Sequence, residues 1–305
     1  MAQTPAPLPG HDRASARRWP TVFERAGRFF ADARRHTGFM IGLTLLVVFF
    51  AIALFAPLLT AFDPYLPNIG NRLKPPFWHD STVAGHPLGT DQLGRDYLTR
   101  LLYGTQISLL VGFGSIAISA VIGICLGLVA GYFGGRVDAV ISFVITTRLS
   151  MPVVLVALAV VAIAGGSLTT VVLVIGLLLW DQFAVVARAA TQQARSADYI
   201  RAAEAMGCST PHILFREILP NITAPLIVVA TVELANAILL EAALSFLGLG
   251  VQAPLPSWGL MLSEAKNFMF FSPWLITLPG LCLFALTMAI NLLGDGLRDL
   301  TKAGR

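Results

Sequence analysis

Six apolar runs, each long enough to cross a lipid bilayer, dominate this sequence. They cover about residues 39–62, 107–132, 139–165, 167–186, 221–246 and 274–293. A spanning α-helix needs about 20 apolar residues, and the hydrocarbon core holds no water that could satisfy the backbone of an open structure. Of the 305 residues, 56% are hydrophobic and 12% are charged, whereas soluble domains hold about 25% charged residues. The sequence therefore predicts an all-α, polytopic integral membrane protein with six transmembrane helices.

The basic residues are distributed unevenly over the two sides of the membrane. Six spans place both termini on one side, and the segments on that side hold fifteen of the 21 Lys and Arg residues. The segments on the opposite side hold five, and Arg148 lies within a span. Because cytoplasmic segments carry the excess of Lys and Arg, we expect both termini to be cytoplasmic. Residues 1–38 are then a basic cytoplasmic tail, and residues 39–305 form one transmembrane domain.

A polar loop between the fourth and fifth spans, residues 187–220, carries helical signals of its own. Tyr199, Ala202, Ala203 and Met206 fall at positions i, i+3, i+4 and i+7, which predicts a short helix with a small apolar face. Small side chains let the surface of another protein approach the helix backbone, as when a helix binds in a groove.

The boundaries of this helix, and of a second one after it, are also marked in the sequence. We expect Asp198 to cap the start of the first helix and Gly207 to end it. The Ser-Thr-Pro sequence at 209–211 is typical of a helix start, and the Leu-Pro pair at 219–220 is expected to close the second helix. The loop is thus predicted to fold as helix, glycine turn, helix.

This loop resembles the EAA loop of ATP-binding-cassette (ABC) importer permeases, in which two Ala, a Gly four residues after the second Ala, and a distal Leu-Pro recur. Two positions depart from the pattern: Arg201 stands where a Glu usually precedes the Ala pair, and Glu217 replaces an apolar residue. The resemblance implies that the loop docks on a cytoplasmic ATPase. The residues assigned to this coupling are Tyr199, Arg201, Ala202, Ala203, Met206, Gly207, Leu219 and Pro220. An amphipathic connector with no partner is the alternative interpretation.

Further motifs resemble the dipeptide, oligopeptide and nickel permease group of these importers (OppC/DppC-like), in the order that the group shows them. They are HPLGTDQLGRD from residue 86, EAALSFLGLG from 241, PSWG from 256 and NLLGDGLRD from 291. The resemblance covers most of the chain and implies a six-helix, MetI-like permease fold. One region departs, because Phe143 and Thr146 stand where the group usually carries an Arg and an Asp in the third span.

No motif in the sequence indicates catalysis. A Gly-rich loop ending in Gly-Lys-Ser/Thr does not occur, so the chain has no recognisable site for ATP phosphates. His86, Asp91 and Asp96 lack the spacing of a metal-ligand set, and we expect Asp96 to cap the helix that leads into the second span. The formal net charge of +4 does not indicate nucleic-acid binding, because no soluble domain gathers the basic residues.

These features favour a transmembrane permease subunit of an ATP-driven importer for peptides or similar small solutes in the bacterial cytoplasmic membrane. By the resemblance, the chain binds no cofactor and is not itself an enzyme, since ATP and Mg²⁺ bind to two partner ATPase subunits. The other implied partners are a homologous second permease, an extracytoplasmic solute-binding protein and membrane lipid. The alternative is a self-contained ion-coupled secondary transporter, which would show inverted repeats and paired intramembrane carboxylates. A structural scaffold ranks third.

Arg148 and Glu233 are the ionisable residues predicted to lie deepest in the bilayer. Each is expected to face the bundle interior, because a charge at mid-bilayer costs at least about 2.5–3.5 kcal/mol. Counting along two straight helices places both at roughly 15–20 Å from the cytoplasmic ends. We expect either a salt bridge between them or, for Arg148, a position in the translocation pathway that attracts a solute carboxylate. Trp258 and Trp274 are expected at the outer interface, where indole rings occupy the headgroup layer.

Overall fold

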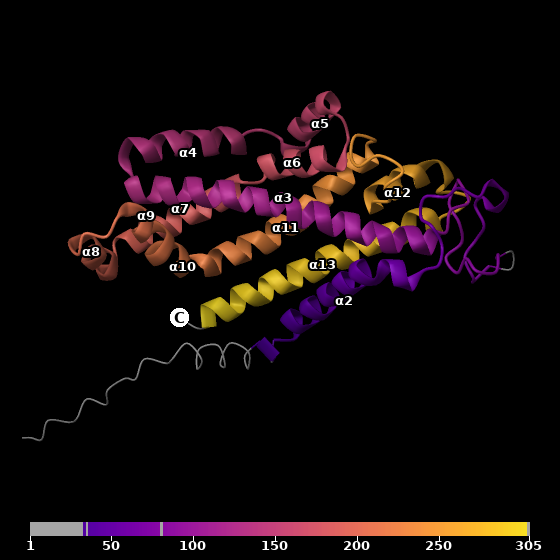
Figure 1. Cartoon of the computed structure of the whole chain (residues 1–305), viewed down its shortest axis with the longest axis horizontal. Coiled ribbons are helices and arrows are strands. Elements are labelled where there is room, and N and C mark those ends of the chain that lie inside the picture. Colours follow the sequence, from indigo (N-terminus) through magenta and orange to yellow (C-terminus); the bar gives the residue numbers. More distant parts are fainter. Residues whose placement is uncertain (1–32, 35, 80–81, 304–305) are drawn as a thin grey trace, which may run out of the picture.

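The chain forms a bundle of long helices with short helical segments at both ends (Figure 1). The computed structural model describes residues 33–34, 36–79 and 82–303, and these residues contain helices, turns and one isolated β-bridge but no β-strand. The all-α architecture predicted from the apolar runs is confirmed. Most of the predicted basic tail, residues 1–32 and 35, lies outside the described residues.

Five helical segments of the described chain are long and apolar enough to cross a membrane. They are α2 (Thr37–Leu59), α3 (Tyr97–Phe133), α6 with α7 (Leu168–Leu178 and Asp181–Arg195), α11 (Thr223–Phe246) and α13 (Trp274–Ala303). The α3 helix begins well before the second apolar run, because polar residues at its start are buried among the outer segments instead of facing lipid.

The third predicted span is a broken helix. Instead of one straight segment over 139–165, the chain forms α4 (Gly135–Leu149) and α5 (Val153–Ala164), and their axes differ by 84°. Pro152 lies in the break and becomes the N-cap of α5. Proline has no backbone N–H and disfavours helical geometry in the residue before it, so α4 cannot continue through this position. The bundle has six spans if this bent pair counts as one.

Small residues allow α3 to lie close against α7 along much of the bundle. Gly123, Gly127 and Gly131 recur every four residues on the buried face of α3. A Cβ atom placed on Gly127 would lie 2.5 Å from the Cβ of Ala187, and one on Gly131 would lie 2.6 Å from the Cβ of Thr191. These positions cannot hold larger residues, and such small-residue stripes are how membrane helices reach close packing.

The two ends of the bundle differ in construction. The end on the left of Figure 1 carries α8 (Asp198–Ala205), α9 (Thr210–His212) and α10 (Leu219–Asn221), and α2 begins and α13 ends there. The opposite end carries α12 (Trp258–Ala265) and the long segment that joins α2 to α3, which includes the 3-10 turn η1 (Ile69–Asn71). Another 3-10 turn, η3 (Lys266–Phe268), follows α12.

Candidate functional site

The first helix of the polar loop is α8, and it ends where the sequence predicted. Gly207 has φ +78°, the N–H of Gly207 donates to Glu204 O (3.0 Å) and the N–H of Cys208 donates to Ala203 O (3.1 Å). This pair of bonds is a Schellman motif, which satisfies the last carbonyls of a helix through a left-handed residue. The predicted cap at the other end is wrong: Ala197 is the N-cap, and Asp198 is the first helical residue with no capping bond.

The second half of the loop is less regular than predicted. After α9, residues Ile213–Ile218 form a π-helix, η2, which passes directly into α10 and then α11. Leu219 and Pro220 therefore lie within helical structure and do not close it, contrary to the prediction. Pro220 has no N–H to donate to the carbonyl four residues before it. The backbone hydrogen bonds here run from residue i to residue i−5, and the N–H of Leu219 donates to Leu214 O.

The apolar residues of α8 lie on two faces, and only one of these faces is free. Ile200 and Ala203 are 0% and 5% exposed and belong to the main hydrophobic core. Tyr199 is 42% exposed, Met206 is 77% exposed, and Ala202 is exposed. The predicted single face of Tyr199, Ala202, Ala203 and Met206 is thus corrected: Ala203 anchors α8 to the bundle, while the other three point outward.

Phe215 is a further exposed apolar residue of the loop. This side chain belongs to the π-helix η2 and is 55% exposed, whereas its neighbour Leu214 is buried. Sequence reasoning missed Phe215, although an aromatic residue directly before Arg216 and Glu217 in a polar loop was a signal that could have identified it. We call the exposed residues Tyr199, Ala202, Met206 and Phe215 the docking face, after the ATPase docking that the resemblance of this loop implies.

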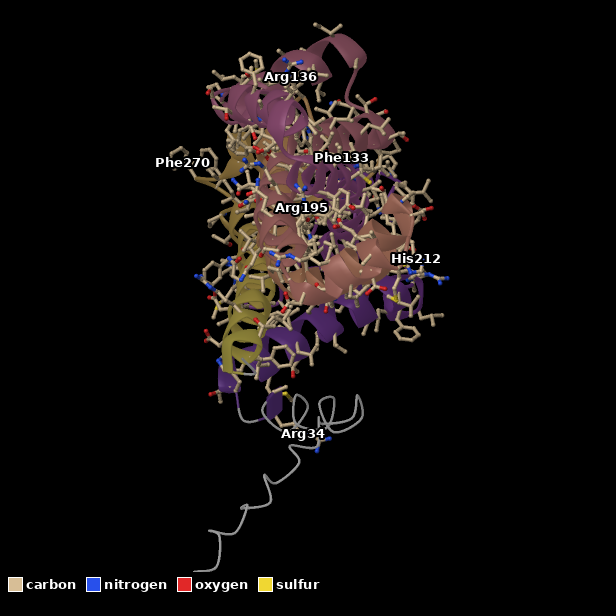
Figure 2. The ribbon with its side chains drawn as sticks, turned by 90° about the vertical axis from the view of Figure 1, so that its left-hand side faces the viewer. Arg34, Phe133, Arg136, Arg195, His212 and Phe270 are labelled. Atoms are coloured by element: carbon tan, nitrogen blue, oxygen red, sulfur yellow. The ribbon has the colours of Figure 1, made fainter. Side chains whose placement is uncertain are left out.

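A polar brace connects α8 to the end of α3. The Tyr132 hydroxyl donates to Glu204 Oε1 at 3.0 Å, and the Arg195 guanidinium lies 5.6 Å from the centre of the Tyr132 ring. Figure 2 views the bundle from this end, and Arg195 lies near the centre of that view. Arg201, another predicted coupling residue, is exposed. Its Nη1 lies 3.9 Å from Asp198 Oδ1, which is a long contact between two exposed side chains. The docking face is therefore held by contacts that lead directly to a long spanning helix.

The residues predicted to lie deepest in the bilayer are not brought together. Arg148, in the last turn of α4, donates from Nη2 to the carbonyl of Leu178, the last residue of α6. Glu233 is buried in α11, and its Oε1 accepts from Asn236 Nδ2 at 3.4 Å. No ion pair among the described residues joins Arg148 to Glu233, so the predicted salt bridge is wrong. The depth estimate assumed a straight third span, whereas α4 stops one residue after Arg148.

An ion pair that the sequence did not reveal does connect α4 to α7. Both Nε and Nη2 of Arg188 donate to the Asp138 carboxylate, the second at 2.7 Å to Oδ2. A bidentate pair fixes the relative orientation of two helices better than a single contact does.

At the opposite end, polar residues of the HPLGTDQLGRD motif form a buried hydrogen-bonded cluster. Asp96 caps α3 as predicted, and its Oδ2 accepts from the N–H of Thr99 at 2.7 Å. His86 Nδ1 lies 2.9 Å from the other oxygen of Asp96. The chain entering α3 is thereby fixed by side-chain bonds.

Two arginines and two acids extend this cluster to α12. Arg100, which is 0% exposed, donates from Nη1 to Asp91 Oδ2 and to Glu264 Oε2, both at 2.6 Å. Arg95 bonds Asp91 at 2.7 Å and approaches Glu264 at 3.4 Å. Breaking such a buried cluster leaves an uncompensated charge, so these four residues hold the loop, α3 and α12 together.

The two tryptophans expected as interfacial anchors are buried inside the protein. Trp258 is 0% exposed and donates from Nε1 to Leu101 O at 3.0 Å, and Trp274 is 8% exposed. A Cβ atom on Gly104 would lie 2.7 Å from the Trp258 ring, so the indole occupies space that this glycine leaves open. Both indole rings therefore pack inside the protein instead of facing lipid headgroups, and the prediction for them is wrong.

Comparison with known proteins places most of the chain in one group. Residues 123–303 match the family described as "Binding-protein-dependent transport system inner membrane component", and residues 26–76 match the "N-terminal TM domain of oligopeptide transport permease C". The dipeptide transport system permease DppC of Haemophilus influenzae is 40% identical over 271 residues, which are 89% of this chain and 92% of that protein.

Two further similarities agree with this placement. The glutathione transport system permease GsiD of Pectobacterium atrosepticum is 38% identical, over 87% of this chain and 86% of that protein. An inward-facing structure of the MetNI methionine ABC transporter superposes with a TM-score of 0.54 and 19% identity, over 68% of this chain and 96% of that chain. At this identity the structural match shows the fold, which is the MetI-like fold predicted from the motifs.

Proposed function

We propose that this chain, which belongs to the family of binding-protein-dependent transport system inner membrane components, carries dipeptides or similarly small peptides across the membrane. It is a multi-pass membrane protein and the permease subunit of an ABC importer. The peptide class is supported by relatives named as dipeptide and di/tripeptide permeases at 40% and 41% identity over 89% of this chain.

The docking face is the observation that carries the proposed coupling to ATP hydrolysis. Its residues belong to α8 and its C-cap and to η2, which lie outside the long apolar helices at one end of the bundle, and Met206 alone is 77% exposed. An exposed apolar patch with a polar rim marks a protein interaction site. We assign it to a cytoplasmic ATPase subunit, one of two that bind ATP and Mg²⁺, while this chain supplies no nucleotide site.

The contacts behind the docking face suggest how motion reaches the membrane. Ile200 and Ala203 fix α8 to the core, and the bond from Tyr132 to Glu204 ties it to the end of α3. When ATP draws the two ATPases together, displacement of α8 is carried to α3 and to α7, which packs closely against α3. The bidentate pair of Arg188 and Asp138 then carries it from α7 to α4. The resulting exchange between inward-open and outward-open states is a rigid-body change of packed helices.

The orientation and the remaining partners follow from the same proposal. The end that carries α8 to α10 faces the cytoplasm with both termini, in agreement with the excess of Lys and Arg on that side. A homologous second permease completes the pathway, and an extracytoplasmic binding protein delivers the peptide at the end that carries α12. Arg148 and Glu233 are kept as pathway candidates, each acting separately since they do not pair.

Uptake of a radiolabelled dipeptide by cells that lack the chromosomal copy tests this function. Cells that produce the intact chain with its partner subunits are expected to accumulate the dipeptide, and Met206→Glu is expected to abolish uptake while the protein remains in the membrane. Exposed Arg136 on α4 offers a matched control, because Arg136→Gln changes the charge at the same end of the bundle without touching the docking face. Uptake that survives ATPase inactivation but is lost when the proton gradient collapses would refute the proposal in favour of an ion-coupled transporter.

A further inference from the structure

A cleft between three helices opens at the end of the bundle that carries the docking face. Its volume is about 440 Å³, and it lies between α7, the start of α11 and the end of α13. Its walls are mostly apolar, and Val186, Pro225, Val228 and Val229 contribute to them. Arg298 is the one cationic residue among those that line it.

The cleft has a polarity gradient along the membrane normal. At 1.5 Å per residue, the 30 residues of α13 extend over about 45 Å, whereas the hydrocarbon core is about 30 Å thick. Arg298 lies within about 8 Å of the end of α13, so we place it in the headgroup layer. Pro225 lies in the first turn of α11, and Val228 and Val229 lie roughly 5 Å deeper, within the acyl region. The polar mouth and apolar interior match the two parts of a phospholipid.

Arg298 is exposed beside the apolar walls of this cleft. No ion pair within 4.0 Å involves Arg298 among the described residues, although Asp295 and Asp299 lie on the same helix. Asp299 instead lies 3.3 Å from His36 Nε2. An exposed cation beside an apolar cleft at the membrane surface is complementary to one anionic headgroup with its chain.

We propose that this cleft is a binding site for one anionic phospholipid, whose phosphate contacts Arg298 and whose acyl chain packs on Val228 and Val229. The bound lipid would fill the space between α11 and α13 and so fix the distance between these helices near the docking face. This inference does not depend on which solute the permease carries.

Native mass spectrometry of the full chain, released from nanodiscs of equal parts phosphatidylglycerol and phosphatidylcholine, tests the site. The intact chain is expected to retain one phosphatidylglycerol, and Arg298→Gln is expected to lower the retained ratio of phosphatidylglycerol to phosphatidylcholine about fivefold. Arg136→Gln removes an exposed arginine of α4, a helix that contributes no residue to the cleft, and is expected to leave the ratio unchanged. Equal ratios for both variants overturn the proposal.

A photo-crosslinking residue at Val228 in native membranes identifies the occupant directly. A lipid adduct supports the proposal, and Val228→Trp, which fills the acyl part of the cleft without changing charge, should remove the retained lipid. A crosslink to residues 1–32 of the same chain, or to another permease chain, overturns it. Thermal unfolding of each variant separates loss of the site from loss of the fold.

Discussion

Substituting the two adjacent alanines of α8 one at a time separates docking from folding. Ala202 is exposed, whereas Ala203 is 5% exposed and belongs to the main core. Ala203→Asp buries a carboxylate without a partner, which costs about 3–5 kcal/mol. The same substitution at exposed Ala202 costs less than about 0.5 kcal/mol of stability. Both variants should stop transport, but for different physical reasons.

Hydrogen exchange of the peptide spanning residues 198–206 measures the difference. A loss of about 3 kcal/mol from the local stability of α8 increases the exchange rate about a hundredfold, because each 1.4 kcal/mol corresponds to a factor of about ten. We expect this increase for Ala203→Asp and almost none for Ala202→Asp. Co-purification of the ATPase should be lost in both, since the first variant displaces α8 and the second places a charge on the docking face.

Two results would refute this reasoning. If Ala203→Asp leaves the exchange of α8 unchanged, the residue does not anchor the helix. If Ala202→Asp retains the ATPase and transports at the normal rate, the exposed surface of α8 is not the docking face. Ala202→Ser, which adds only a small hydroxyl, serves as the matched control and is expected to transport normally.

Four further predictions concern both ends of the bundle. Gly207→Val should cost at least about 1–2 kcal/mol, since φ is +78° there, and should impair transport in the uptake assay. Tyr132→Phe removes the hydrogen bond to Glu204, which is worth about 1 kcal/mol. In proteoliposomes this variant should transport less substrate per ATP hydrolysed, while its expression level stays unchanged. Arg100→Met should destabilise the outer end by about 3–5 kcal/mol in thermal unfolding, because the acids around it lose their partner. The purified chain alone should show no ATPase activity above background, and activity in a preparation free of ATPase subunits would contradict this.

Some features of the fold were predictable from the sequence because one physical effect decided them. The length of the apolar runs predicted which segments can cross the membrane. Gly207 ended α8 because glycine adopts the left-handed conformation at low cost. Asp96 capped α3 because its short carboxylate reaches the free N–H groups of the first turn. In each case the deciding interaction lies within a few residues of the chain.

Other features depended on contacts between distant segments, which no local pattern determines. The α8 sequence has apolar residues on two faces, Tyr199 with Met206 and Ile200 with Ala203, and only packing against the bundle decides which face is buried. The location of Arg148 was wrong for a different reason, because hydropathy does not detect the break between Leu149 and Val153, where the axes of α4 and α5 differ by 84°. Pro152 in this break was the available local signal.

The α3 helix connects the two differently built ends of the molecule. Arg100 and Tyr132 both belong to it, and at 1.5 Å per residue they lie about 48 Å apart. At the end that carries α12, removing one charge from the cluster around Arg100 costs about 3–5 kcal/mol of stability. The hydrogen bond from the Tyr132 hydroxyl to Glu204, which ties α8 to α3, contributes about 1 kcal/mol. Movement imposed at the docking face therefore deforms the contacts of α8 before those of the outer cluster. Transmission of that movement to the outer end requires α3 to move as one rigid body together with Asp91, Arg95 and α12.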